Sequence, residues 1–403
     1  MKSTLKVTLV LMLVATMLLA ACAASQTAAP AAEDNAAAPA AADTAAAPAE
    51  ADNAAAPATE DTAAAPAADT GQICQGIKFG LITPIGGLGD NAIGDATYQG
   101  FVEAQEKLGF EFDYSEPMSA TDYESMIIDY SKTGDYNLIF LAGNDGLDPV
   151  NAVGPDYPDQ KFIVYDIQAE GNDQYISEYF AKNEIGFVAG VLAALMEEKG
   201  EVTIAGKTTT FTPTGKIGLV MGVELPSTVP ALTGAAAGIK YVKPDYEYLY
   251  GIVGDWKDQV KNKEVALSMY DQGVHFIFQN AGGGALGIVA AAKERGQFFI
   301  GYDTDQTSWD PSLVIGSSRK QNSAVILRVL TQYCESGGNL AWGTSEINSA
   351  SNGGVGFNYN PDLAVPEDVA TTIDAVIAAL KEGTIKAPNT WEEVDAFNDV
   401  YKP

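Results

Sequence analysis

The sequence predicts an α/β protein of two lobes, each built on a parallel sheet with helices on both sides. Strand-like apolar runs alternate with helix-like segments, and the helix-like segments repeatedly end on glycine. About 331 residues follow an N-terminal stretch that cannot form a core. Alternating strands and helices are typical of parallel sheets covered on both faces. A folded part of that length exceeds one typical core and suits two.

The first 72 residues resemble an export signal followed by a spacer. Lys2 and Lys6 precede the apolar run 7–20, which at about 14 residues is too short to span a bilayer as a helix. We interpret residues 1–21 as a lipoprotein signal peptide. Residues 22–72 are rich in Ala, Pro and acidic residues and contain no aromatic or basic residue, so they predict a disordered tether.

Cys22 ends the run Leu19-Ala20-Ala21-Cys22, which resembles the lipobox of bacterial lipoproteins. That resemblance implies cleavage before Cys22 and lipid modification of its thiol. Two or more acyl chains give stable anchoring. We therefore expect a folded domain that works at the extracytoplasmic face of the cell membrane, lipid-anchored through Cys22.

Charge and composition exclude several classes of function. Of the 53 acidic and 23 basic residues, 45 and 21 lie beyond the tether, which leaves the folded part near −24. Such a surface repels nucleic acid, so no nucleic-acid partner is expected. Because the chain has a single histidine, His275, most histidine-based catalysis and His-rich metal sites are excluded. We expect no enzyme activity, no metal site and no cofactor.

Cys74 and Cys334 are the other two cysteines, in a compartment that permits disulfides. A bridge between them is plausible if Cys74 leads into the first strand and Cys334 lies on a helix beside it. Two free buried thiols are the alternative, because the sequence cannot place their Cα atoms.

The strand-like runs are continuous enough to predict strands buried on both faces. They are residues 77–83, 137–142, 161–167, 216–223, 248–253, 275–279 and 298–302, with a further one at 315–318. Helices are predicted to end at Gly109, Gly200, Gly273, Gly296 and Gly383. Thr121 and Glu124 predict a capping box at the start of one more helix.

These elements divide into two lobes. Lobe 1 is expected at residues 73–182 with part of 316–345, and lobe 2 at 183–315 with the C-terminal part of 346–403. The segments after residue 315 would cross between the lobes more than once. Crossings of this kind leave a cleft, which is where ligands bind in α/β proteins.

The run Gly282–Gly287 fits the G-x-G-x-x-G pattern of dinucleotide sites, after a strand and before a helix. It lies late in the second block, however, and an exported lipoprotein has little access to NAD. We retain only the general point that glycines at a helix start allow a ligand to approach backbone N–H groups.

Four segments occur along the chain in the order Gly86-Gly87-Leu88-Gly89-Asp90-Asn91, Met269-Tyr270-Asp271-Gln272-Gly273-Val274, Gly301-Tyr302-Asp303-Thr304-Asp305-Gln306 and Gly353-Gly354-Val355-Gly356-Phe357. In this order they resemble the basic membrane protein family. Together with the lipobox, the resemblance covers nearly all of 75–388. It implies a substrate-binding lipoprotein of an ABC importer, of the type that binds purine nucleosides, with the periplasmic-binding-protein type I fold of two Rossmann-like lobes joined by crossing hinge strands.

The resemblance also implies a set of ligand-binding residues. Asp90, beside Asn91, matches the aspartate of the first loop, and Asp303 matches a strand-end aspartate that binds ribose. Lys320 matches a lysine that donates to a ribose oxygen. The remaining matches are Asp166 for base-edge N–H groups, Trp256 for stacking on the base, and Gly282 and Gly283 for the backbone near the sugar.

Simpler interpretations stand beside these matches. Asp166 and Asp303 would serve equally as helix caps, and Trp256 as a core aromatic. An exposed, solvated Lys320 next to Arg319 is the usual state of a lysine.

The first loop departs from the family. Where the family commonly has Lys-Ser-Phe-Asn-Gln, this chain has Asn91-Ala92-Ile93-Gly94-Asp95. Ile93 thus replaces the phenylalanine that would cover the second face of the base, a stacking contact typically worth ~0.5–1.5 kcal/mol beyond its area.

We therefore expect a monomeric, tethered binding protein that closes on a small polar ligand and delivers it to an ABC permease. A purine nucleoside is the leading candidate for that ligand. A ligand-sensing receptor lipoprotein is one alternative, and a binding protein for a sugar or riboflavin is another. An exported nucleoside hydrolase is the third, and it would need an acid–base pair or a metal.

Overall fold

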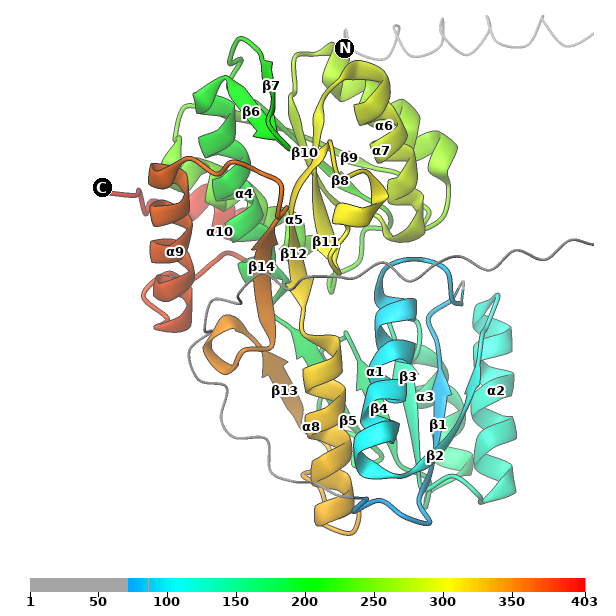
Figure 1. Cartoon of the computed structure of the whole chain (residues 1–403). Coiled ribbons are helices and arrows are strands. Elements are labelled where there is room, and N and C mark those ends of the chain that lie inside the picture. The colour runs from blue at the N-terminus through cyan, green and yellow to red at the C-terminus, as the bar shows by residue number, and fades with distance from the viewer. Residues whose placement is uncertain (1–71, 86, 403) are drawn as a thin grey trace, which may run out of the picture. The chain divides into compact units, whose positions relative to one another are not determined.

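A computed structural model describes residues 72–85 and 87–402, all within one compact unit, Ala64–Pro403. The predicted signal peptide, Cys22 and all of the tether except Gln72 lie outside the described residues. The described chain forms two six-stranded sheets and one two-stranded hairpin. Figure 1 shows the two sheets one above the other with their helices around them.

The first sheet, the core of lobe 1, has the strand order β13-β5-β4-β3-β1-β2, and all its strands run parallel. These strands are β1 (Lys78–Ile82), β2 (Glu111–Ser115), β3 (Leu138–Ala142), β4 (Phe162–Tyr165), β5 (Tyr175–Phe180) and β13 (Ser345–Asn348). The helices of lobe 1 are α1 (Ile93–Leu108), α2 (Ala120–Thr133), α3 (Leu147–Val153) and α8 (Asn322–Glu335).

The second sheet, the core of lobe 2, has the order β14-β12-β11-β10-β8-β9, and only β14 is antiparallel to its neighbour. These strands are β8 (Lys216–Met221), β9 (Glu247–Ile252), β10 (Phe276–Asn280), β11 (Phe298–Asp303), β12 (Val314–Lys320) and β14 (Val355–Tyr359). Lobe 2 also holds the hairpin β6 (Glu201–Ile204) and β7 (Lys207–Thr210), and the helices α4 (Lys182–Lys199), α5 (Val229–Val242), α6 (Gln259–Asp271), α7 (Leu286–Arg295), α9 (Glu367–Lys381) and α10 (Trp391–Ala396).

The strands predicted from continuous apolar runs are all present, which confirms the α/β class with parallel sheets. Every residue of β3, β10 and β11 is buried, as expected for strands covered on both faces. The edge strand β2 is largely exposed and polar, so its sequence carried no apolar run. The predicted helix ends are confirmed, because Gly109, Gly200, Gly273, Gly296 and Gly383 all have positive φ.

The predicted capping box at Thr121 and Glu124 is wrong. Helix α2 begins at Ala120, and the side chain of Ser119 caps it by accepting a hydrogen bond from the Asp122 N–H at 3.2 Å. Ser119 lies two residues earlier and is an equally good N-cap residue. The pattern therefore located the helix correctly but misplaced its start.

Helices α4 and α5 pack at unusually close range through glycines spaced four residues apart. A Cβ on Gly186 would lie 1.9 Å from the Ala231 carbonyl oxygen, and one on Gly238 would lie 2.1 Å from that of Phe187. Only a residue without a side chain permits this approach. The contact holds α4 against α5 within lobe 2, and it therefore also holds Lys182, the first residue of α4, in place.

The chain crosses between the lobes three times. It enters lobe 2 between β5 and α4, returns to lobe 1 between β12 and α8, and enters lobe 2 again between β13 and β14. Helix α8 packs on α1, with Ile326 against Gly100. Lys182 and Lys320 thus stand at the first two crossings, at the base of the cleft between the lobes.

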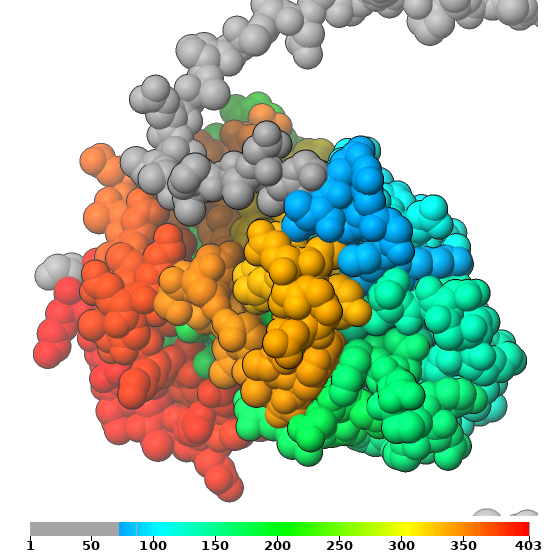
Figure 2. All heavy atoms as spheres, turned by 90° about the horizontal axis from the view of Figure 1, so that it is seen from below, coloured from blue at the N-terminus to red at the C-terminus, as the bar shows by residue number. Residues whose placement is uncertain are grey.

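Cys74 and Cys334 form a disulfide with their Cα atoms 5.4 Å apart. Cys74 precedes β1 and is fully buried, and Cys334 lies near the end of α8. Figure 2 shows the N-terminal segment of lobe 1, in blue, against the orange helix α8. The bridge ties the start of the folded chain to the helix that follows the second crossing.

Candidate functional site

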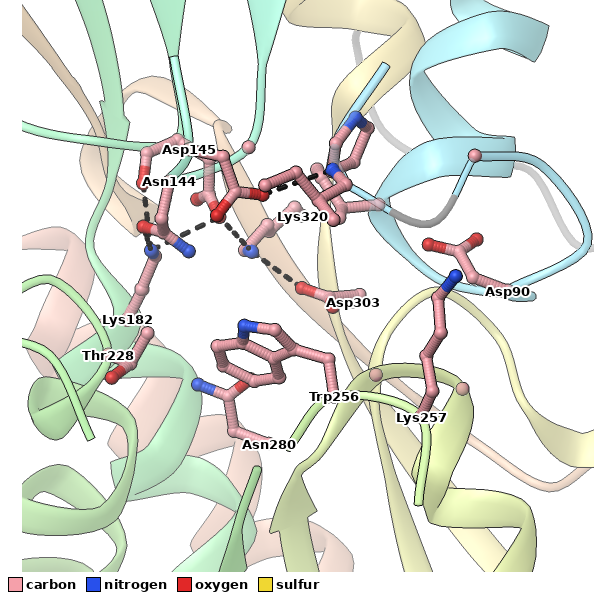
Figure 3. A pocket seen from close by; sticks show the side chains of 18 residues that line it. Asp90, Asn144, Asp145, Lys182, Thr228, Trp256, Lys257, Asn280, Asp303 and Lys320 are labelled. Atoms are coloured by element: carbon pink, nitrogen blue, oxygen red, sulfur yellow. Dashed lines mark hydrogen bonds and ion pairs between the residues drawn. The ribbon is translucent and has the colours of Figure 1, made fainter. Parts of the chain in front are cut away.

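A pocket of about 620 Å³, including space open to solvent, lies between the two lobes. Its walls come from loops at the C-terminal ends of strands in both sheets, and its base lies at the crossings (Figure 3). This size falls within the usual range for small-ligand sites. The predicted site residues that line it are Asp90, Ile93, Asp166, Trp256, Gly282, Gly283, Asp303 and Lys320.

Asn91 is the predicted site residue that does not line the pocket. Its main-chain oxygen instead accepts a hydrogen bond from Thr304 Oγ1 at 3.0 Å. Asn91 belongs to lobe 1 and Thr304 to lobe 2, so this hydrogen bond joins the two lobes beside the pocket.

A charged cluster forms the base of the pocket. Lys320 Nζ lies 2.9 Å from Asp166 Oδ2 and 2.6 Å from Asp303 Oδ1, and thereby joins a carboxylate of lobe 1 to one of lobe 2. Lys320 is only 6% exposed, so the alternative interpretation, a solvated lysine, is wrong. The reason is local: β12 is an inner strand, and its last residue points into the cleft where two carboxylates compensate its charge.

Lys182 adds a second ammonium group to the same cluster. Its Nζ donates to the main-chain oxygen of Asp166 at 2.8 Å, and it lies 3.1 Å from Asp166 Oδ2 and 3.4 Å from Asn144 Oδ1. Two lysines therefore share one oxygen of Asp166, whereas Asp166 Oδ1 is buried with no hydrogen-bond partner among the described residues. The four charges balance, with two carboxylates and two ammonium groups.

The pKa values of the two lysines shift in opposite directions, because Lys320 contacts two carboxylates and Lys182 contacts one. Burial lowers the pKa of Lys320, but Asp166 and Asp303 together raise it by more than burial lowers it. The pKa of Lys320 therefore lies above the ordinary value. For Lys182, burial dominates, Asp166 opposes it only in part, and the pKa falls to about 8. Burial also raises the pKa of Asp303, against the opposing effect of Lys320.

Asp166 and Asp303 both have φ of +72°, a left-handed conformation at the end of a central strand. Aspartate tolerates this conformation better than most residues do. The turn away from strand geometry directs each carboxylate into the cleft rather than along the sheet. Asp166 and Asp303 contact lysines across the cleft base.

Trp256 lies in the loop between β9 and α6, on the lobe 2 side of the pocket. A Cβ on Gly222 would come within 2.5 Å of its Cε3 atom, so Gly222 allows the indole to lie against the main chain. The Gly284 N–H also donates to the Trp256 main-chain oxygen at 2.8 Å, which ties the glycine run to this loop. Trp256 therefore presents a supported aromatic surface to the pocket (Figure 3).

The first loop differs from the expectation in what its aspartate contacts. Asp90 accepts hydrogen bonds from the N–H groups of Ala92, Gly94 and Asp95, at 2.9, 2.9 and 3.1 Å. It lines the pocket while holding the start of α1. A Cβ on Gly94 would lie 2.7 Å from the Gly87 carbonyl oxygen, so this loop has no room for the family's asparagine at that position.

Six polar or charged residues of the pocket were not predicted from the sequence: Asn144, Asp145, Lys182, Thr228, Lys257 and Asn280. Asn280 ends the buried strand β10, and a polar residue at the end of such a strand is a signal that could have identified it. Asn144 and Asp145 likewise follow β3. Lys182 carried no signal, because a lysine in the first turn of a helix is ordinarily solvated.

Among residues 72–85 and 87–402, no three His, Cys, Asp or Glu side chains group in a way that could hold a metal ion. Within the same ranges, no helix combines the length and the apolar character needed to cross a bilayer.

Two lobes joined by three crossings, with a pocket between them, form an architecture found in solute-binding proteins. The chain belongs to the family described as ABC transporter substrate-binding protein PnrA-like, whose pattern matches residues 78–389. Members of this family are substrate-binding proteins, and the resemblance stated from the sequence is confirmed.

The relatives agree with this assignment. The chain is 26% identical to the ABC transporter nucleoside-binding protein BmpA of Lactococcus lactis, over 79% of this chain and 91% of that protein. It is also 26% identical to an uncharacterized lipoprotein of Pyrococcus abyssi, over 81% of this chain and 82% of the relative. The structure of a solute-binding protein from Aeropyrum pernix shares the fold, with a TM-score of 0.67 at 24% identity, over 79% of this chain and 96% of that one.

Proposed function

We propose that the chain captures a purine nucleoside between its lobes and delivers it to the membrane permease of an ABC importer. In this proposal the lipid on Cys22 holds the protein at the extracytoplasmic face, and one copy of the chain forms the complete site. Asp90, Asp166, Trp256, Gly282, Gly283, Asp303 and Lys320 would surround the ligand, with Ile93 beside them and Asn91 contributing through the loop contact to Thr304.

The observation that carries the proposal is the Asp303–Lys320 pair at the pocket base. An ammonium group has three hydrogens; one of those of Lys320 donates to Asp166 Oδ2 at 2.9 Å, and if a second is set aside for the ion pair with Asp303 Oδ1, a third remains. The third can donate to a hydroxyl oxygen, while the Asp303 carboxylate can accept from hydroxyl hydrogens. A vicinal diol such as that of ribose satisfies both groups at once.

Trp256 supports a ligand that also has a flat apolar face. Stacking on an aromatic side chain is worth about 0.5–1.5 kcal/mol beyond area burial. With Ile93 rather than an aromatic residue lining the pocket, the base would be stacked on one side and packed against an aliphatic chain on the other. The nucleoside-binding name of the Lactococcus lactis relative supports the same class of ligand.

A thermal-shift screen tests the ligand class. Purine and pyrimidine nucleosides, free bases, riboflavin and sugars would each be added to the purified folded domain. A ligand at 100 times its Kd stabilises the fold by about 2.7 kcal/mol. We expect purine nucleosides to raise the melting temperature. Stabilisation by a sugar or riboflavin alone would overturn the nucleoside assignment and leave the fold untouched.

Two controls sharpen this screen. Asp303→Ala should abolish the nucleoside shift, whereas Asp129→Ala, which changes an exposed aspartate on α2, should leave it intact.

Transport itself is tested in cells that lack the chain, which should lose nucleoside uptake. Unchanged uptake would point to a sensing role instead of import.

A further inference from the structure

The charges that line the pocket do not all compensate one another. Asp166, Asp303, Lys182 and Lys320 balance within their cluster. Asp90 is held by three main-chain N–H groups, one in its own loop and two in the first turn of α1. Asp145 is the remaining carboxylate of the pocket wall, and among the described residues no lysine, arginine or histidine nitrogen lies within 4.0 Å of it.

Asp145 is fixed in place but has unused capacity. Its Oδ2 accepts a hydrogen bond from the Ile85 N–H at 3.1 Å, which joins the loop after β3 to the loop after β1. A carboxylate has about four acceptor positions, so three remain. Burial raises the pKa of Asp145, and only the Ile85 N–H opposes that effect. A carboxylate in this setting gains most from N–H donors that a ligand brings with it.

Asp145 and Trp256 belong to opposite lobes and both line the pocket, as Figure 3 shows. A base that stacks on Trp256 would therefore turn its edge toward the wall that carries Asp145. The purine edges differ in what they offer there. Guanine presents two adjacent N–H donors, hypoxanthine presents one, and adenine presents a donor beside a ring-nitrogen acceptor. A carboxylate only accepts, so it pairs with the first, pairs partly with the second and repels the acceptor of the third.

We propose that Asp145 is the residue that determines base specificity, by accepting the edge N–H donors of a 6-oxopurine nucleoside. This inference rests on the proposed function, because it assumes that a nucleoside occupies the cleft. The order of affinity that follows is guanosine, then inosine, then adenosine. It gives Asp145 the role that the family resemblance implies for Asp166, whose Oδ2 is shared between two lysines and whose Oδ1 is buried without a hydrogen-bond partner among the described residues.

The test is calorimetric titration of guanosine, inosine and adenosine into wild type, Asp145→Asn and Asp148→Asn. The asparagine at 145 keeps an acceptor for the Ile85 N–H and presents a donor to the ligand. We expect at least a tenfold fall in the ratio of guanosine affinity to adenosine affinity. Asp148 is exposed in the first turn of α3, so Asp148→Asn should keep the wild-type ratio.

A second measurement needs no variant. 1-Methylguanosine lacks the ring N–H, and wild type should bind it at least tenfold more weakly than guanosine. Equal binding of the two, or an unchanged guanosine-to-adenosine ratio in Asp145→Asn, would overturn the role of Asp145 while nucleoside binding stands. Failure of every nucleoside to bind wild type would overturn the proposed function itself, and this inference with it.

Discussion

The ends of β4 and β11 occupy the same place in the two lobes, third in each strand order, and both carry Tyr-Asp. Tyr165 and Tyr302 are almost fully buried, and Asp166 and Asp303 share φ of +72°. The next strand in each lobe leads to a lysine, Lys182 just after β5 and Lys320 at the end of β12.

The two corners differ in how fully they are paired. Asp166 has two ammonium groups within 4.0 Å, whereas Asp303 has one among the described residues. Tyr165 Oη donates to Asn322 Oδ1 at 2.9 Å, whereas Tyr302 Oη is buried without a partner in the described chain. The Asp166 corner therefore has one more ammonium partner and one more tyrosine hydrogen bond than the Asp303 corner, although each aspartate keeps an Oδ1 without a hydrogen bond among the described residues. The two lobes repeat the same backbone geometry at these strand ends. The neighbouring side chains determine how far each aspartate is paired within the protein.

The largest test of this comparison removes the lysines one at a time. Lys320→Met leaves Asp303 without a counter-charge, and breaking a buried pair in this way costs about 3–5 kcal/mol. Lys182→Met leaves Asp166 with Lys320 and removes an ammonium group whose charged form burial already disfavours, so at pH 7 it should cost much less than Lys320→Met. Urea denaturation at pH 7 measures both. Equal losses would mean that the two corners are paired alike.

The second test is the pH dependence that Lys182 imparts. Its pKa falls from the ordinary 10.5 to about 8 on folding, so the unfolded chain binds more protons between pH 8 and pH 10.5. The free energy of unfolding should therefore rise with pH across that window, by about 3 kcal/mol at ~1.4 kcal/mol per pKa unit.

Lys182→Met removes this dependence, and the other titrating groups are common to both proteins. The measurement is thus the difference between the two unfolding free energies at several pH values from 7 to 10.5. A difference that stays flat would show that Lys182 keeps its ordinary pKa.

The smallest test exchanges the two tyrosines for phenylalanine. Tyr165→Phe removes the hydrogen bond to Asn322 and should cost about 1 kcal/mol. Tyr302→Phe removes a buried hydroxyl that has no partner among the described residues, so it should be neutral or stabilising. Thermal denaturation without ligand distinguishes them. A loss for Tyr302→Phe as large as that for Tyr165→Phe would contradict the asymmetry.

Much of the fold could be predicted because inner parallel strands are apolar on both faces, as β3, β10 and β11 are. Strand β5 could not be, since it buries Ser177 and Glu178. Glu178 is tolerated there because Arg328 from α8 and Asn348 from β13 bind its carboxylate. Those partners lie about 150 residues or more from Glu178 along the chain, so no local sequence pattern predicts them.

The same limit applies to the site. Asp166 and Asp303 were identified through the family resemblance, whereas Lys182 and the burial of Lys320 were not predicted. Their environment exists only where the crossings bring the lobes together. A local pattern locates strand ends, but it does not show which charges meet there.

The disulfide between Cys74 and Cys334 also determines how the folded domain bears mechanical load. A pull applied through the chain before Cys74 is divided at Cys74 between the disulfide to α8 and the main chain that leads into β1. Helix α8 follows directly on the crossing that carries Lys320. Tension from the N-terminal side therefore reaches the C-terminal end of α8 through a covalent link, and β1 does not bear it alone.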